Sequence, residues 1–195
     1  MPMDVVKDPQ LERIDAIMND CTFPWSIAGG WSIDLTIGRK TREHQDMDIV
    51  VFREYVQDVL NYFSDWQVGV VIPGEHRLEV VIDKNQVELP RYCLHLQHEQ
   101  DFVEVLITDH ANDQVIYRRN PSITIPLQDF IRIDSMNRRY VTPEWQLLFK
   151  AKSPRECDRQ DFINALNYLD VTQKEWLRHA LMKTHASSEW VDLLW

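Results

Sequence analysis

Residues 28–34 read AGGWSID, and residues 38–51 read GRKTREHQDMDIVV. The second segment contains Asp46 and Asp48, which open an apolar run that is typical of a β-strand. Because residues i and i+2 of a strand share one face, we expect both carboxylates to point the same way. Two anions this close stay ionised together most easily when a cation lies between them. Since aspartate and phosphate oxygens commonly surround Mg²⁺, the pattern predicts a site for Mg²⁺ and a nucleoside triphosphate.

The glycine pair Gly29-Gly30 lies between a predicted strand at residues 25–28 and a predicted helix at residues 32–37. A turn without side chains lets the backbone approach a phosphate, and N–H groups at the helix N-terminus become donors. A tight turn that binds nothing is the alternative for such a pair. We expect Gly38 to end the helix, since glycine is a common C-terminal stop.

Basic side chains surround the predicted phosphate site. Arg39, Arg42 and His44 lie between the glycines and the aspartates. We expect them to bind the triphosphate through charge-assisted hydrogen bonds; the alternative is a solvated loop whose charge offsets the acids. Lys150 lies near the end of a predicted helix, where it either interacts with the helix C-terminus or reaches the phosphates across a cleft.

A third acid is needed to complete the metal site, and the segment at residues 101–109 offers candidates. Glu104 lies inside an apolar run, where a carboxylate is costly unless it meets a cation or a hydrogen-bond donor. We therefore choose Glu104, with Asp101 as the alternative. Cys93, His95 and His98 are residue types that can bind zinc, but no second pair follows at a finger-like spacing, so we expect no zinc site there.

The composition is that of a globular protein. The chain has 195 residues, of which 44% are hydrophobic, and a formal net charge of −10. The acidic balance argues against general binding of duplex nucleic acid and is compatible with a cationic small substrate. No apolar run approaches the roughly 20 residues of a membrane span. Three cysteines without paired spacing indicate a reducing, cytoplasmic setting.

The pattern of elements predicts an α+β fold in two parts. Residues 1–141 form an α/β core, and residues 142–195 form a helical region that packs against it, because no Gly/Ser/Pro-rich linker separates them. Helices are predicted at residues 8–19 and 54–63 and throughout the C-terminal part. We interpret the short apolar runs after residue 66 as antiparallel strands; they lie at residues 67–71, 77–82, 86–89, 102–107 and 115–117.

These segments resemble the nucleotidyltransferase superfamily typified by DNA polymerase β. The closer similarity is to its antibiotic-modifying branch, the aminoglycoside and lincosamide nucleotidyltransferases. The residues that carry the resemblance are 29–34 and 38–49, with a second match at 147–155 that is followed by Asp158 and Asp161. Two departures are visible: many members have serine where this chain has Gly30, and the third acid is usually aspartate rather than Glu104.

The resemblance implies a mixed sheet flanked by helices, with Asp46, Asp48 and Glu104 as the catalytic acids that hold Mg²⁺, two ions in all. It also implies that the triphosphate is bound by Gly29, Gly30, Arg39, Arg42, His44 and Lys150.

The expected reaction is transfer of a nucleoside monophosphate, AMP from ATP, to a hydroxyl of a small molecule such as an aminoglycoside or a lincosamide. A homodimer is compatible with this interpretation. Three alternatives stay open: a haloacid-dehalogenase-type phosphatase, to which the Asp46-x-Asp48 spacing also conforms; a degenerate fold that only binds; and transfer to a protein or a tRNA end, as in toxin–antitoxin modules.

Overall fold

The computed structural model describes residues 6–75 and 77–195, which form a sheet with helices packed on both of its faces. The helices are α1 (Pro9–Ile17), α2 (Gly29–Ile37), α3 (Val56–Tyr62), α4 (Leu127–Phe130), α5 (Pro143–Lys150), α6 (Glu156–Ala165), α7 (Val171–Thr184) and α8 (Trp190–Leu193). The strands are β1 (Ser26–Ile27), β2 (Met47–Phe52), β3 (Gln67–Ile72), β4 (Arg77–Val80), β5 (Cys93–His98), β6 (Asp101–Ala111), β7 (Gln114–Ile116), β8 (Thr124–Pro126), β9 (Ile131–Ile133) and β10 (Arg139–Val141). Two short 3-10 helices are η1 (Arg53–Tyr55) and η2 (Lys84–Val87).

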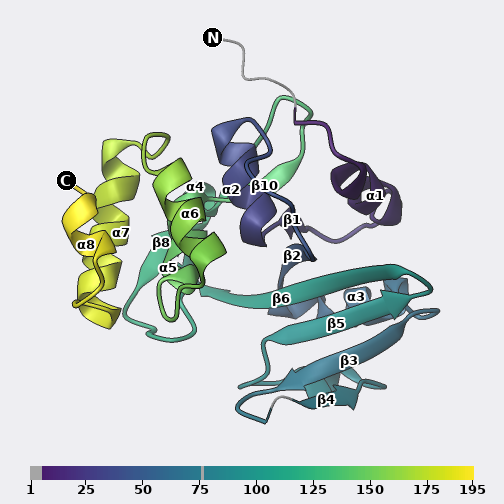
Figure 1. Cartoon of the computed structure of the whole chain (residues 1–195). Coiled ribbons are helices and arrows are strands. Elements are labelled where there is room, and N and C mark those ends of the chain that lie inside the picture. Colours follow the sequence, from purple (N-terminus) through teal and green to yellow (C-terminus); the bar gives the residue numbers. More distant parts are fainter. Residues whose placement is uncertain (1–5, 76) are drawn as a thin grey trace.

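The strands form a mixed sheet in the order β4-β3-β5-β6-β2-β1-β10-β9, and β7 and β8 extend it from the far end of β6. β2 runs parallel to β6, whereas β5 runs antiparallel to both β3 and β6. Figure 1 shows β6, β5, β3 and β4 side by side, with α5 to α8 grouped at the opposite end of the molecule. The mixed sheet and its flanking helices confirm the predicted α+β class.

Alternation along the central strands gives the sheet two unlike faces. Ile49 and Val51 of β2 and Val103 and Val105 of β6 are buried in a core that α1 and α3 also line. Residues of the opposite parity, among them Asp48, point to the other face, where the C-terminal helices lie. The chemistry-bearing side chains therefore face away from the main core.

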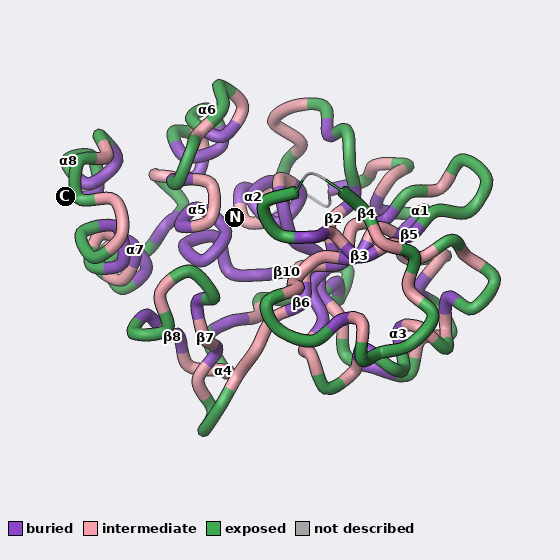
Figure 2. The backbone as a smooth tube through the Cα atoms, turned by 90° about the horizontal axis from the view of Figure 1, so that it is seen from below, coloured by how far each residue is buried: buried purple, intermediate pink, exposed green. Residues whose placement is uncertain are grey.

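A second apolar core joins the C-terminal helices to the rest of the chain. Leu147 and Leu148 of α5 are fully buried in it together with Val115 of β7. The rings of Phe162 and Trp190 stack with centroids 4.3 Å apart. Figure 2 shows buried backbone where α2, β10 and α5 meet. The helices thus pack against the sheet, while a domain boundary at residue 142 stays a prediction.

Local hydrogen bonds explain where the predicted elements fail. The strand predicted at residues 86–89 is wrong, since residues 84–87 form η2. The Asp83 carboxylate accepts the N–H of Asn85 at 2.8 Å, and Gln86 Oε1 accepts the N–H of Ile82 at 2.7 Å. These side chains close the backbone into a turn that competes with a strand.

The strand pairing was also only partly predicted. The strands after residue 66 that neighbour one another pair antiparallel as expected, whereas the parallel pairing of β6 with the earlier strand β2 was not predicted. The strand β5 was not predicted, because its buried face is only Leu94 and Leu96 and the alternating residues are cysteine, histidine and glutamine, which give a weak apolar pattern. The predicted helix stop is confirmed: α2 ends at Gly38, whose φ of +83° is the left-handed conformation that glycine favours.

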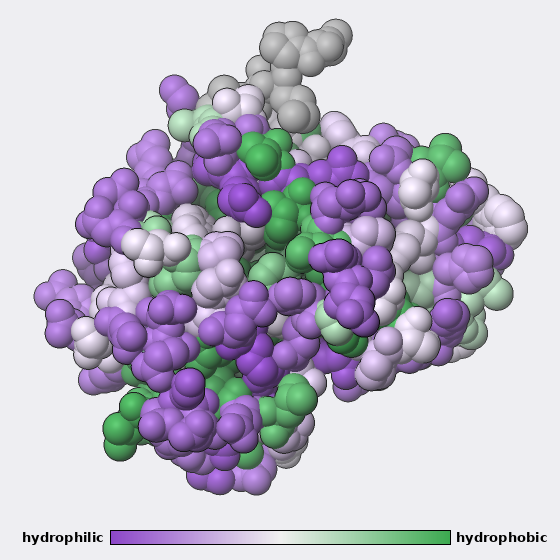
Figure 3. Space-filling model, turned by 180° about the vertical axis from the view of Figure 1, so that it is seen from behind, coloured by the Kyte–Doolittle hydropathy of each residue, from purple (hydrophilic) through white to green (hydrophobic). Residues whose placement is uncertain are grey.

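The outer surface is mainly polar. Figure 3 shows a face that is mainly hydrophilic, with apolar groups recessed between polar ones. Among the described residues, the helices are all too short or too polar to cross a membrane.

Candidate active site

A cavity of about 530 Å³ lies between the polar face of the sheet and helix α5. Asp48 of β2 and Glu104 of β6 line it together with Gly29, the first residue of α2. Cationic and aromatic groups complete the wall: Arg118, Arg119, Lys150, Lys152, Arg155, Tyr92, Trp145 and Phe149. The cavity therefore combines carboxylates, cations and flat apolar surfaces.

Two carboxylates meet where β2 and β6 run side by side. Asp48 and Glu104 are directly paired in the parallel register. Burial raises the pKa of Asp48 to about 7, the negative charges of Glu104 and Asp46 add to the rise, and the Lys150 charge opposes it. Two adjacent carboxylates stay ionised together only when a cation lies beside them. Their oxygen atoms therefore fit a divalent metal ion such as Mg²⁺.

The other two candidate acids lie differently. Asp46 is exposed, immediately precedes β2, and acts on Asp48 through its charge without lining the cavity. Asp101 pairs with Arg13 near the start of β6 and differs in parity from Glu104, so it belongs to the other face of the strand. The structure thus brings Glu104, and not Asp101, to Asp48.

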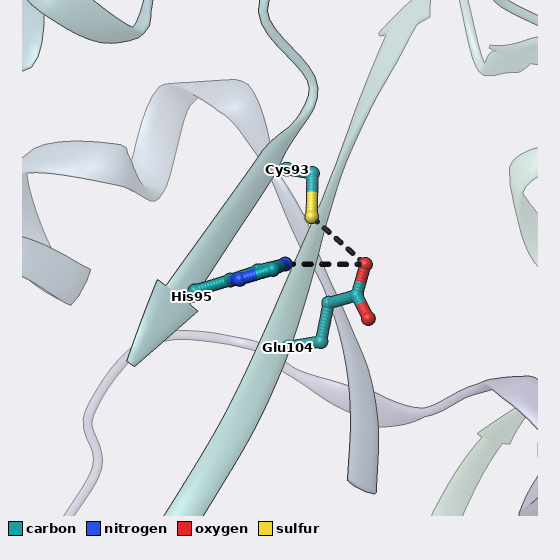
Figure 4. Close-up of side chains that lie close together, drawn as sticks. All are labelled: Cys93, His95 and Glu104. Carbon is teal, nitrogen blue, oxygen red and sulfur yellow. Dashed lines mark hydrogen bonds and ion pairs between the residues drawn. The ribbon is translucent and has the colours of Figure 1, made fainter. Parts of the chain in front are cut away.

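The strand β5 supplies partners for Glu104 from its other side. Cys93 Sγ donates to Glu104 Oε1 at 2.9 Å, and His95 Nε2 lies 3.9 Å from the same oxygen. Figure 4 shows the three side chains converging on one face of the sheet. Burial raises the pKa of the Cys93 thiol, and the neighbouring Glu104 charge raises it further. The thiol is therefore a proton donor to the carboxylate.

Each glycine of the pair makes room for a different group. Gly29 has a φ of +63°, and a Cβ there would lie 1.8 Å from Asp48 Oδ2. At Gly30 a Cβ would lie 2.4 Å from Arg42 Nη2 and 2.5 Å from His44 Nδ1. The pair is the first turn of α2 rather than a separate loop, and this helix has no side-chain N-cap. Its N–H donors at that end are consequently available beside Asp48.

Arg42 forms an ion pair inside the protein, with Asp161. Its guanidinium donates to both oxygens of Asp161 in α6, each at 2.8 Å. Lys150 Nζ lies 3.0 Å from Asp161 and 2.8 Å from Asp158. Burial alone would raise the pKa of Asp161, but Arg42 and Lys150 outweigh it and hold the pKa below its usual range. This network ties the segment before β2 to the C-terminal helices.

His44 and Arg39 do not line the cavity. His44 Nε2 lies 2.7 Å from Asp34 Oδ2, and its ring lies against Trp31 with a centroid distance of 4.3 Å. Asp34 also accepts the backbone N–H of Thr41 at 3.0 Å. Arg39 is exposed at the end of α2. Of the residues predicted to bind phosphate, Gly29 and Lys150 line the cavity, whereas Arg42 and His44 lie against Gly30 in the first turn of α2.

Two arginines that follow β7 were missed in the sequence. Arg118 lies over the rings of Tyr92 and Phe149, at 4.9 and 5.6 Å from their centroids. Arg119 lies 4.9 Å from the Phe149 ring and donates to the Phe149 carbonyl at 2.9 Å. Burial lowers the pKa of Arg118, and the adjacent Arg119 charge lowers it further. In the sequence, only the adjacency of the two arginines after a predicted strand could have indicated an anion-binding role. An anionic ligand would relieve the repulsion between their charges.

Comparison with known proteins identifies the family. Residues 10–120 match the family model described as aminoglycoside-2''-adenylyltransferase. The chain belongs to this family. The lincosamide antibiotic adenylyltransferase LnuA, solved with lincomycin bound, superposes with a TM-score of 0.58 at 20% identity, covering 85% of this chain and all of LnuA.

A second solved structure supports the same fold. The antibiotic-resistance factor ANT(2'')-Ia superposes on this member of the aminoglycoside-2''-adenylyltransferase family with a TM-score of 0.59 at 16% identity, covering 91% of each chain. No curated protein sequence matches the chain. The family assignment confirms the resemblance and makes the protein a nucleotidyltransferase enzyme, so the phosphatase and binding-only alternatives are no longer needed.

Proposed function

We propose that the protein transfers AMP from ATP to a hydroxyl group of a small antibiotic-like molecule in an Mg²⁺-dependent reaction. The observation that carries this proposal is the Asp48–Glu104 pair, which faces a cavity beside the N-terminus of α2. The family's description names adenylyl transfer, which favours ATP as the donor. The acceptor is a proposal because the family model extends only over residues 10–120.

The metal site would consist of Asp48 and Glu104, with Asp46 at its outer edge. Bound Mg²⁺, two ions in the expected arrangement, would supply Lewis-acid stabilisation of charge on the phosphates. Asp48 keeps its carboxylate against Gly29, and Glu104 approaches from the parallel strand. Glu104 would accept the proton of the attacking hydroxyl, as the acceptor oxygen bonds to the α-phosphorus and pyrophosphate leaves.

The phosphates would be bound by groups that already lie at the cavity. Lys150 is held by Asp158 and Asp161, so its ammonium is positioned before the nucleotide arrives. The first-turn N–H groups of α2 and the Arg118 guanidinium supply further donors. Direct contact of phosphate with Arg42, His44 or Arg39 stays a prediction that the internal pairing of Arg42 and His44 does not favour.

The charges of the cavity favour an acceptor with few positive charges. Asp158 is paired with Lys150, and Asp109 with Arg53, so neither offers a free carboxylate to an ammonium group. Arg118 and Arg119 project into the same cavity. A polycationic aminoglycoside would meet these cations, whereas a hydroxyl-bearing lincosamide-like molecule would meet less repulsion.

The decisive experiment is a transfer assay with ATP, Mg²⁺ and a panel of lincosamides and aminoglycosides. We expect pyrophosphate release and one adenylyl group added to the acceptor, detected by mass spectrometry, with lincosamide-like acceptors preferred. Asp48→Asn is the matched inactive control. Binding of ATP without turnover on any small acceptor would contradict the proposal, and modification of an added protein or tRNA would redirect it. Light scattering in the same buffer tests whether the protein is a homodimer.

A further inference from the structure

Cys93, His95 and Glu104 form a three-residue cluster that the adenylyl-transfer reaction does not use as a unit. Cys93 and His95 alternate on one face of β5, and His95 is directly paired with Glu104 of β6. One ligand atom from each residue lies within 4.8 Å of the others. The side chains of His95 and Glu104 are 30% and 29% exposed, so ions in the solvent can reach them.

The donor set is unlike that of a magnesium site. A thiolate sulfur, an imidazole nitrogen and a carboxylate oxygen are typical ligands of Zn²⁺ and Co²⁺, whereas Mg²⁺ takes oxygen ligands. Three protein ligands leave a fourth tetrahedral position open. The sequence spacing of Cys93 and His95 did not reveal this set, because the third ligand comes from the neighbouring strand.

The observed distances are close to those of a tetrahedral ion. Bonds of about 2.0–2.3 Å separate neighbouring donors by roughly 3.3–3.8 Å. The Cys93–Glu104 and His95–Glu104 separations are 2.9 and 3.9 Å. The Cys93 and His95 donor atoms lie within 4.8 Å of each other, so side-chain shifts of about 1 Å would suffice, with the Cys93 proton released when the metal binds.

We propose that Cys93, His95 and Glu104 bind one zinc-class transition-metal ion (Figure 4). Such an ion takes up Glu104 Oε1, an oxygen of the carboxylate that the proposed Mg²⁺ site beside Asp48 also needs. The ion is therefore an inhibitor of nucleotidyl transfer, and this second part rests on the proposed function. The binding itself does not, because it requires only the geometry of the three side chains.

Cobalt substitution tests the binding directly. We expect the full-length, reduced protein to show a thiolate-to-cobalt charge-transfer band when Co²⁺ is added, and Zn²⁺ to displace it. The band is lost in Cys93→Ser and retained in Cys21→Ser and Cys157→Ser, which are matched controls because both cysteines are free and partly buried. Circular dichroism confirms that each variant is folded.

A second variant keeps the thiol and removes a different ligand. His95→Gln is expected to weaken Co²⁺ binding by roughly 100-fold or more, since loss of even an outer partner of a metal ligand costs about 10–100-fold. No thiolate band in the wild type, or a band that survives Cys93→Ser, overturns the proposed site. If His95→Gln binds Co²⁺ with unchanged affinity, His95 is not a ligand, and the proposed three-ligand site is overturned.

Inhibition is measured separately, with each variant compared with its own rate in Mg²⁺ alone. Zn²⁺ in slight excess over protein should lower the wild-type transfer rate severalfold and leave Cys93→Ser less affected. A cobalt band without zinc inhibition would overturn the inhibitory role and leave the site. If no transfer activity is found at all, the proposed function fails while the cobalt titration still decides the metal site.

Discussion

The two faces of strands β2 and β6 are fixed by different information. On one face, Ile49 and Val105 are fully buried against α1 and α3, and any apolar residue of similar volume would meet the same need. On the other face, Asp48 lies opposite Glu104, which in turn contacts Cys93. The first face depends on alternation along one strand, and the second depends on which strands are neighbours. Variants of the two faces should therefore fail in different ways.

The largest effect should come from removing a carboxylate of the polar face. Asp48→Asn or Glu104→Gln deletes a proposed metal ligand, which is worth several kcal/mol of transition-state stabilisation. We expect turnover to fall by about a thousandfold or more, since about 1.4 kcal/mol corresponds to a factor of ten. Pyrophosphate release at saturating ATP measures it.

The fold of these two variants should survive, as checked by circular dichroism. A rate within about threefold of the wild type for Asp48→Asn would show that the polar face does not hold the metal.

Substitutions on the apolar face of β2 and β6 should lower the free energy of unfolding rather than turnover. Ile49→Ala removes a fully buried side chain from the main core. Large-to-small core substitutions of this kind cost about 2–5 kcal/mol. Urea denaturation should show that loss, while turnover per folded molecule at low temperature stays near the wild-type value. A selective loss of turnover with unchanged stability would mean that the two faces are not separate.

The carboxylates should also make metal-free stability depend on pH. The folded pKa of Asp48 is raised to about 7 from 3.8, so the native state binds more protons than the unfolded state between these values. Stability therefore falls as the pH rises from about 4 to about 7, by a few kcal/mol, and then levels off. Urea denaturation at a series of pH values in EDTA measures the slope.

Asp48→Asn should flatten that pH dependence, and Mg²⁺ should restore stability at pH 8 in the wild type but not in this variant. An equal slope in the two proteins would assign the pH dependence to other groups.

The sequence predicted what local pattern encodes. The apolar run after Asp48 predicted the strand that is β2, and a glutamate amid apolar residues pointed to Glu104. The Gly38 stop followed from glycine's access to the left-handed region. Each of these depends on residues within one turn or one strand of the feature, where periodicity and backbone preference suffice.

What the sequence could not predict depends on long-range contacts. The partner of Arg42 is Asp161, 119 residues away, and that pairing makes an expected phosphate ligand a link between the segment before β2 and α6. Arg118 lies over the ring of Tyr92 at the cavity, and the pairing of β5 with β6 places Cys93 beside Glu104. Both contacts join residues that are distant in the sequence. Neither propensity nor spacing encodes which distant strand or helix becomes the neighbour.

The smallest effect should come from Asp101, the rejected candidate for the third acid. It lies on the same strand as Glu104 but pairs with Arg13, whose side chain is largely exposed. Because an exposed ion pair contributes little, Asp101→Asn should leave the melting temperature within experimental error and turnover unchanged. The comparison with Glu104→Gln uses two carboxyl-to-amide changes three residues apart on β6. If Asp101→Asn lost activity as severely as Glu104→Gln, the parity of β6 would not be what selects the third acid.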